Sequence, residues 1–316
     1  MLLYIDCLVN SELKFYSMDV INEEDTFVFG YNQPSCLDGK LESLCEKNDI
    51  PAIDKILASE DLKKSLSLPQ IYVICSKYGH IDTLKYLHKY LVNNDFLYDT
   101  LQFALCFAVE NNQYGVVEFL LDCGARPNCK YVHTDYGYLV SDYTPLEYAI
   151  VENNFDIVSL LLERGASIAK SKSALILANK NFDMIKYLID KGADVNSCHH
   201  GEFHINTPLI SIAQSNRPNI EIFNYLIDHG ADIKIHGGDI IARAFFKKNI
   251  EIIKICIEND IYYGTFDCNY PDPFGSYDER YVTRVNPLKL LKFFMYEDPK
   301  YYEVLEKKFE KFLMSE

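Results

Sequence analysis

Apolar and polar residues alternate along much of this chain with the period of short amphipathic helices. In FDIVSLLLERG (155–165) and FDMIKYLIDKG (182–192) the apolar residues recur every three or four positions, with charged residues between them. A glycine ends each pattern, as expected of a residue that closes a helix in the left-handed conformation. Each segment therefore predicts a short helix that buries one face.

A second helical pattern precedes segments of this kind. TPLEYAIVENN (144–154) and TPLISIAQSN (207–216) begin with a threonine that can cap a helix and a proline that suits its first turn. Small residues, Ala149 and Ala213, permit close approach between helices. The chain therefore predicts pairs of short antiparallel helices, each pair followed by a loop.

The helix-pair pattern recurs along the chain. Four segments share one ending: LLDCGARPN (120–128), LLERGASIA (161–169), LIDKGADVN (188–196) and LIDHGADIK (226–234). Their Gly-Ala pairs begin at Gly124, Gly165, Gly192 and Gly230, so the steps between them are 41, 27 and 38 residues. A shared ending at this spacing indicates a solenoid built from one repeated unit.

These segments resemble the ankyrin repeat, whose pattern reads roughly TPLHxAAxxGHxxIVxxLLxxGADVN. TPLEYAIVENNFDIVSLLLERGAS (144–167) and KNFDMIKYLIDKGADVN (180–196) are close matches, and LCFAVENNQYGVVEFLLDCGARPN (105–128) has Asn112 at the turn glycine. The resemblance implies an all-α ankyrin-repeat solenoid of stacked helix pairs with short β-turn fingers, about six to eight units including caps. A tetratricopeptide-type solenoid is the alternative, but it would show a steadier period and no GADVN turn.

The resemblance divides the chain into four parts. Residues 1–37 match no repeat and are expected to form an N-terminal cap or irregular segment, in which DTFVFGYN (25–32) alternates like a strand. About six unevenly spaced repeats follow over 38–262, then an aromatic insertion over 263–285. A C-terminal repeat or capping helices occupy 286–316, where NPLKLLKFFM (286–295) imitates the start of a repeat.

Family resemblance implies protein binding through loop tips and the concave face, so breaks in the repeat spacing are the candidate contact sites. The longest loop between well-matched repeats is CKYVHTDYGYLVSDY (129–143), where a strand–DYG–strand pattern predicts a projecting β-finger. Tyrosine offers large contact area at low entropic cost. The candidate binding residues of the finger are Tyr131, His133, Asp135, Tyr136 and Tyr138. The alternative is a longer loop that lies flat on the next repeat.

Three further loops complete this picture. The loop tip at His199, His200 and Phe203 is expected to contact the partner together with the finger. The insertion IYYGTFDCNYPDPFGSYDERYVTRV (261–285) is too aromatic for disorder, and we expect it to seal the end of the solenoid rather than bind. The loop SIAKSKSA (167–174) is short, so its finger should be nearly absent.

The sequence shows no pattern of residues that is typical of a metal site or of a catalytic site. CHHGEFH (198–204) holds Cys198, His199, His200 and His204, but the adjacent Cys198 and His199 do not fit the spaced pairs of zinc sites, and we expect no metal there. The phosphate-loop, HExxH and GxSxG signatures are missing. We therefore predict a non-catalytic protein with no cofactor.

The net charge and the cysteines indicate which kind of partner and which cellular compartment to expect. The formal net charge is −15, which counts against nucleic acid and anionic membranes and favours an unidentified protein partner with a basic surface. No run approaches the roughly 18 apolar residues of a membrane helix. The 10 cysteines are scattered and without CxxC pairs, as in reduced proteins of the cytoplasm or nucleus.

Two alternatives come from the family resemblance. Ankyrin proteins of large DNA viruses, which this chain resembles in its worn repeats, often end in an F-box-like tail. NPLKLLKFFMYEDPKYYEVLEKKFEKFL (286–313) lies where such a tail would recruit a ubiquitin ligase, although its start matches poorly. The family also includes substrates of an asparaginyl hydroxylase, and Asn196 in the DVN turn matches their target position. The simpler interpretation of Asn196 is a hydrogen bond within the turn.

Overall fold

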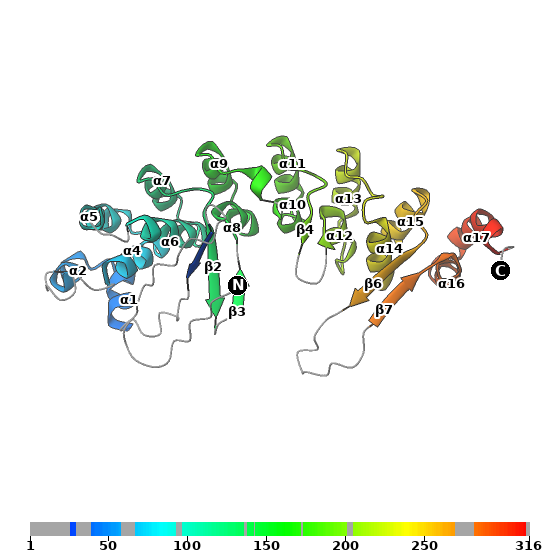
Figure 1. Ribbon diagram of the computed structural model, residues 1–316, viewed down its shortest axis with the longest axis horizontal. Coiled ribbons are helices and arrows are strands. Elements are labelled where there is room, and N and C mark those ends of the chain that lie inside the picture. The colour runs from blue at the N-terminus through cyan, green and yellow to red at the C-terminus, as the bar shows by residue number, and fades with distance from the viewer. Residues whose placement is uncertain are drawn as a thin grey trace. The chain divides into compact units, whose positions relative to one another are not determined.

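The structure is a computed structural model of the chain (Figure 1). It describes residues 26–29, 39–57, 67–92, 97–135, 138–141, 143–171, 173–200, 205–268 and 281–313; over 130–141 the description is of the backbone. The chain divides into two compact units, Met1–Ser171 and Lys172–Glu316.

The first unit is a stack of helix pairs. The pairs are α1 (Gly39–Glu46) with α2 (Ile50–Leu57), α4 (Ser67–Lys77) with α5 (Ile81–Leu91), α6 (Leu97–Glu110) with α7 (Tyr114–Asp122), and α8 (Pro145–Val151) with α9 (Phe155–Glu163). First helices contact one another in the order α1, α4, α6, α8, and second helices in the order α5, α7, α9. The stack therefore has two layers of helices.

The second unit repeats the arrangement. Its pairs are α10 (Ala174–Leu177) with α11 (Phe182–Asp190), α12 (Pro208–Ala213) with α13 (Ile220–Asp228), α14 (Gly237–Phe246) with α15 (Ile250–Glu258), and α16 (Pro287–Glu297) with α17 (Pro299–Leu313). The described residues thus hold eight helix pairs. The predicted all-α solenoid of six to eight units is confirmed.

Helix ends follow the predicted local chemistry. The Thr144 side chain accepts a hydrogen bond from the Glu147 amide, and the Glu147 carboxylate accepts one from the Thr144 amide, which makes a capping box at the start of α8. The second helices α7, α9, α11 and α13 end at glycines with positive φ, such as Gly165 at 93° and Gly192 at 91°. Asn112 and Asn153 take the same left-handed region, at φ 57°, in the turns inside two pairs. The glycines mark the ends of repeats and the asparagines mark the turns within them, because few other residue types adopt such backbone angles cheaply.

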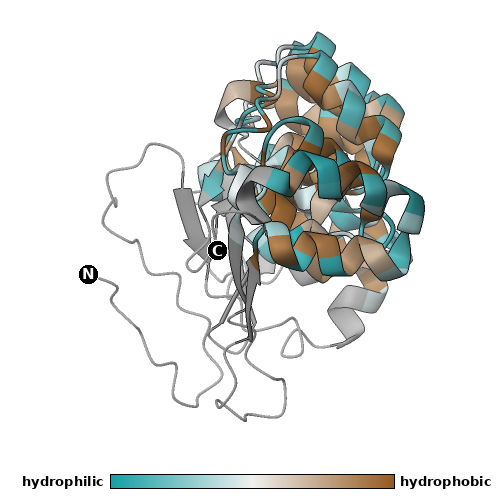
Figure 2. Ribbon diagram, turned by 90° about the vertical axis from the view of Figure 1, so that its right-hand side faces the viewer, coloured by the Kyte–Doolittle hydropathy of each residue, from teal (hydrophilic) through white to brown (hydrophobic). Residues whose placement is uncertain are grey.

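The core lies between the helices of each pair and between neighbouring pairs. Leu84 and Leu87 of α5, and Ile222 and Phe223 of α13, are completely buried. Figure 2 shows polar residues on the outward sides of the helices and apolar residues between them. Each fully buried large apolar side chain contributes about 1.5–3 kcal/mol, so the repeated interfaces hold the stack together.

Hairpins fill three of the loops between helix pairs. The strands are β1 (Thr26–Phe29), β2 (Lys130–Asp135), β3 (Tyr138–Ser141), β4 (His199–His200), β5 (Ile205–Asn206), β6 (Gly264–Cys268) and β7 (Tyr281–Val285). β2–β3, β4–β5 and β6–β7 are antiparallel pairs. In its described residues the loop after α9 holds the 3₁₀ turn η2 (Ile168–Lys170) and no strand, which confirms the predicted loss of a finger there.

Candidate functional site

The β2–β3 finger starts and ends at fixed points of the first unit. Cys129, just before β2, is 1% exposed, and its Sγ lies 4.0 Å from Sγ of Cys106 on α6. Thr144, just after β3, is held by the capping box and is 8% exposed. Figure 1 shows β2 and β3 extending away from the helices between these anchors. The predicted hairpin is therefore present and projects from the stack.

Four of the five finger residues predicted to bind lie on described strands. Tyr131, His133 and Asp135 occupy alternate positions of β2, and Asp135 pairs across the hairpin with Tyr138. Tyr136 lies outside the described residues. The register shifts between His133 and Thr134, so a bulge interrupts the ladder at mid-finger. The hairpin brings the four residues into one small sheet.

An N-terminal strand extends this sheet. β1 pairs with β2 in parallel, with Phe27 opposite Tyr131 and Phe29 opposite His133. A strand is thus present within the expected 25–32, and it pairs with the finger strand β2. Whether 1–37 also caps the first helix pair stays a prediction. The sequence offered no signal for this pairing, because alternation predicts a strand without predicting its neighbour. Residues 1–25 and 30–38 lie outside the described ranges.

The second predicted contact lies in the other unit, on the β4–β5 loop. His199 pairs with Asn206 and His200 with Ile205, and the His199 side chain is exposed. Phe203 and His204 lie outside the described residues. The finger belongs to the first unit and this loop to the second, and a shared contact patch of the two stays a prediction.

Asn196, the candidate modification site, connects two repeats. Its Nδ2 donates to the carbonyl oxygen of Gly230 over 2.9 Å, and its Oδ1 accepts from the Asp232 amide over 2.8 Å. Asn128 makes the same pair of bonds with Gly165 and Ser167 in the first unit. The expected hydrogen bond of the carboxamide therefore reaches the next repeat rather than staying within its own turn.

The aromatic insertion near the C-terminus forms the third described hairpin, β6–β7, and residues 269–280 between its strands lie outside the description. β6 lies against α14 so closely that a Cβ on Gly264 would be 2.0 Å from the carbonyl oxygen of Gly238. The hairpin thus occupies the same place in its repeat as the first finger. Whether it also seals the solenoid end, as we expected, stays a prediction.

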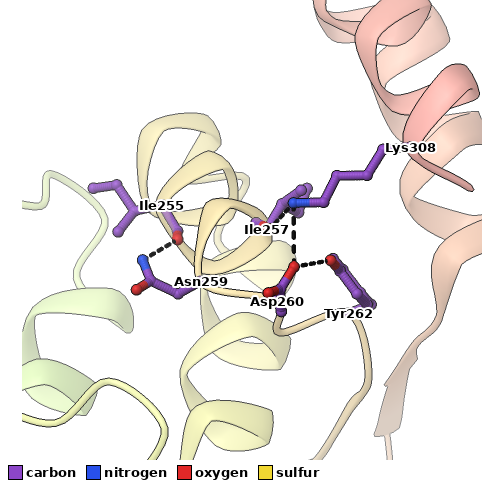
Figure 3. A network of polar contacts seen from close by, with 6 residues as sticks. All are labelled: Ile255, Ile257, Asn259, Asp260, Tyr262 and Lys308. Carbon is purple, nitrogen blue, oxygen red and sulfur yellow. Dashed lines mark hydrogen bonds and ion pairs between the residues drawn. The ribbon is translucent and has the colours of Figure 1, made fainter.

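Lysines tie the last helix pair to the pair before it. Lys308 of α17 donates to the carbonyl oxygen of Ile257 over 2.8 Å and forms a 3.3 Å ion pair with Asp260, which also accepts from the Tyr262 hydroxyl (Figure 3). A cation at the C-terminal end of α15 is favoured by the helix dipole. The Tyr262 hydrogen bond and the Lys308 charge hold the pKa of Asp260 below its usual value.

A second ion pair holds the start of α17, and here the lysine comes from α15 and the aspartate from the start of α17. Lys254 of α15 lies 2.9 Å from Asp298, the residue that precedes α17 and accepts a hydrogen bond from the Tyr301 amide. This lysine lowers the pKa of the Asp298 carboxyl. Leu305 and Phe309 of α17 are completely buried. The C-terminal helices therefore pack as a repeat.

Within the described ranges, no group of three or more His, Cys, Asp and Glu residues is placed to hold a metal ion. None of the described helices combines the length and apolar character needed to cross a membrane. Thiols such as Cys256 are buried, which raises the pKa of that thiol to about 12 and keeps it protonated.

Comparison with known proteins bears on the repeat region. A family model described as ankyrin repeats (3 copies) matches residues 73–172, 132–199 and 174–267, together more than half of the chain. Among similar solved structures is the human ASB11 ankyrin repeat domain, which is 21% identical, covers 61% of this chain and 85% of its own, and superposes with a TM-score of 0.42. No curated protein matches the chain significantly.

Proposed function

The chain belongs to the ankyrin-repeat family, and we propose that it is a non-catalytic protein that binds another protein through its β2–β3 finger. Ankyrin repeats imply a protein–protein interaction role. The proposed contact residues are Tyr131, His133, Asp135, Tyr136 and Tyr138, joined by a second contact at His199, His200 and Phe203.

The observation that carries this proposal is the projecting three-stranded sheet. β1 adds to β2 from more than a hundred positions away in the sequence, and Cys129 and Thr144 fix the base of the hairpin. A sheet of three strands holds its shape better than an isolated hairpin, which is marginally stable in water. A stiff support loses little conformational entropy when its tyrosines engage a partner.

The overall charge suggests the chemistry of the partner at the finger. With a net charge of −15, the chain attracts a basic surface at long range, which raises the association rate more than the affinity. We also propose a reducing location, the cytoplasm or nucleus, where buried thiols such as Cys45, Cys75 and Cys256 remain reduced.

The proposal treats Asn196 and the C-terminal helices as scaffold. The Asn196 carboxamide is engaged with the next repeat, which supports a structural role over modification by an asparaginyl hydroxylase. The lysine contacts of α17 with the preceding pair support a terminal repeat over a free tail that recruits a ubiquitin ligase.

Quantitative affinity capture from native cells tests the proposal. The full chain and a Tyr131→Ser/Tyr138→Ser variant are compared, with Tyr114→Ser as the control because Tyr114 is 43% exposed on α7 of the same repeat. We expect partner recovery to fall about tenfold for the finger variant, in line with the loss of aromatic anchors at an interface, and to be unchanged for the control. Equal recovery by all three proteins, with equal helical content by circular dichroism, would reject the finger as the contact site.

A further inference from the structure

The second unit carries a surface whose character differs from the rest of this acidic chain. It comprises Phe246 and Lys247 at the end of α14 and Lys289, Lys292, Met295 and Tyr296 on α16, and is called the α14–α16 surface below. Phe246, Met295 and Tyr296 are 46%, 45% and 79% exposed, so three large apolar side chains meet solvent on neighbouring repeats.

Helical spacing places the charged and apolar members together. Lys289, Lys292 and Tyr296 follow one another at intervals of three and four residues, and therefore share one side of α16. Between them, Leu290, Leu291 and Phe294 are buried and Phe293 is half-buried. The exposed stripe is thus the side of α16 that faces away from the core.

Contacts between the two repeats join α14 to this stripe. Phe245 and Phe293 lie with ring centroids 5.1 Å apart beneath it, and Lys248 forms a 3.7 Å ion pair with Glu297 at its end. On the α14 side, the Lys247 ammonium is 5.6 Å from the Phe246 ring centroid and donates to Asn216 over 3.0 Å. The two helix pairs that carry the surface are therefore in direct contact.

The local charge is the reverse of the global charge. Over 237–249 and 286–297 the charged side chains that reach solvent are four lysines, Lys247, Lys248, Lys289 and Lys292, against Asp239 and Glu297. The corresponding first helix α6 has only acidic charges, Asp99 and Glu110. The acids nearest the end of α16 already pair with other lysines, Glu297 with Lys248 and Asp298 with Lys254. Within the described residues, Lys289 and Lys292 form no ion pair.

We propose that the α14–α16 surface docks an acidic protein segment that carries a large apolar side chain. The lysines attract the carboxylates, while Phe246, Met295 and Tyr296 offer apolar area and a flexible thioether that adapts to the inserted side chain. A polyanionic nucleic acid fits less well, because it would be repelled by the remaining surface of a chain with net charge −15. This site lies on the second unit and the finger on the first, and the two differ in the charge of the expected partner.

Selection from a displayed library of random linear peptides on the full chain provides the test. We expect the enriched peptides to be net negative and to contain Leu, Ile, Phe or Tyr. Fluorescence anisotropy with labelled copies of those peptides then measures Kd for the wild type, Lys289→Glu/Lys292→Glu and Met295→Ser/Tyr296→Ser. Each variant should weaken binding about tenfold or more, and added salt should weaken wild-type binding.

Matched controls lie on the second helix of the same repeat. Lys307→Glu and Val304→Ser change an exposed charge and a 56% exposed apolar side chain on α17, and should leave Kd unchanged. The Tyr131→Ser/Tyr138→Ser finger variant should also bind the peptides normally, which separates this inference from the proposed function.

Several results would overturn the inference. These are no enrichment of acidic peptides, enrichment of neutral or basic ones, or equal Kd values for wild type and both surface variants at unchanged helical content. A labelled single-stranded DNA probe that binds the wild type but not Lys289→Glu/Lys292→Glu would assign the surface to nucleic acid. Self-association that the Met295→Ser/Tyr296→Ser change abolishes would assign it to a second copy of the chain.

Discussion

Asn196 hydrogen-bonds to the backbone of Gly230 in the next repeat, so one side chain connects two turns of the stack. Its Oδ1 also accepts a hydrogen bond from the Asp232 amide, so two hydrogen bonds join the repeats. Such a bond couples neighbouring repeats, and in a solenoid the coupling between neighbours determines how cooperatively the stack unfolds.

Asn196→Ala should therefore destabilise the second unit. Two hydrogen bonds at an exposed site contribute about 1–2 kcal/mol together, and their loss should lower the urea midpoint of unfolding. Asn224→Ala, an exposed asparagine on α13, serves as the control and should have little effect. An unchanged midpoint for Asn196→Ala would show that the carboxamide does not couple the repeats.

The two threonine caps differ in a way that can be measured. Thr144 caps α8 in a full capping box, and its hydroxyl also donates to the buried Glu147 carboxylate over 3.0 Å. Thr207 caps α12 through the Ile210 amide alone, because the third helical residue there is apolar. Thr144→Ala should cost about 2 kcal/mol and Thr207→Ala about 1 kcal/mol, as measured by chemical denaturation. Equal costs would mean that Glu147 finds another donor without loss.

Local signals explain why most of the fold could be predicted. A left-handed glycine such as Gly165 ends a helix, and a capping threonine such as Thr144 starts one. Both roles depend only on residues next to them in the sequence, so the sequence pattern reveals them directly. The DYG turn likewise predicted the hairpin of β2 and β3, because turn type follows from residues next to one another.

Contacts between distant segments explain what could not be predicted. The pairing of β1 with β2 depends on register and edge availability, and neither has a signature in the strand sequence. The α14–α16 surface was missed for a related reason. Phe246 and Tyr296 look like core residues in a helical pattern, and only the structure shows that they are exposed.

The close approach of Gly264 to Gly238 provides a third test, which separates steric from conformational demands on glycine. A Cβ at Gly264 would lie 2.0 Å from a backbone oxygen and 2.8 Å from Ile241, so α14 or β6 must move. Gly165 has φ 93° with open space around its Cβ position, so alanine there incurs backbone strain alone. Gly264→Ala should cost about 3 kcal/mol and Gly165→Ala about 1–2 kcal/mol, measured by denaturant unfolding. The reverse order would contradict the described position of β6 on α14.

The lysine contacts of α17 predict acid sensitivity of the last repeat. The pKa of Asp260 is lowered below the ordinary value of an aspartate by the Tyr262 hydroxyl and by Lys308, and the pKa of Asp298 is lowered by Lys254. A lowered folded-state pKa means that each carboxylate contributes stability above its unfolded pKa, and that this contribution is lost as pH falls through the folded value. Thermal unfolding followed by circular dichroism between about pH 5 and 2 should therefore show a falling midpoint in the wild type.

The matched variants isolate these two carboxylates. Asp260→Asn and Asp298→Asn should each lower the midpoint at pH 5 and flatten its pH dependence, because the variant side chain cannot be protonated. Glu303→Gln, which changes an exposed acid on α17, controls for the loss of one negative charge. Hydrogen exchange of the α15–α17 amides should be faster in Asp260→Asn and Asp298→Asn than in the wild type and in Glu303→Gln. The reason is that a terminal repeat that loses its ion pairs opens before the rest of the stack. If the aspartate variants keep the wild-type slope, the ion pairs at the two ends of α17 do not hold the last repeat in place.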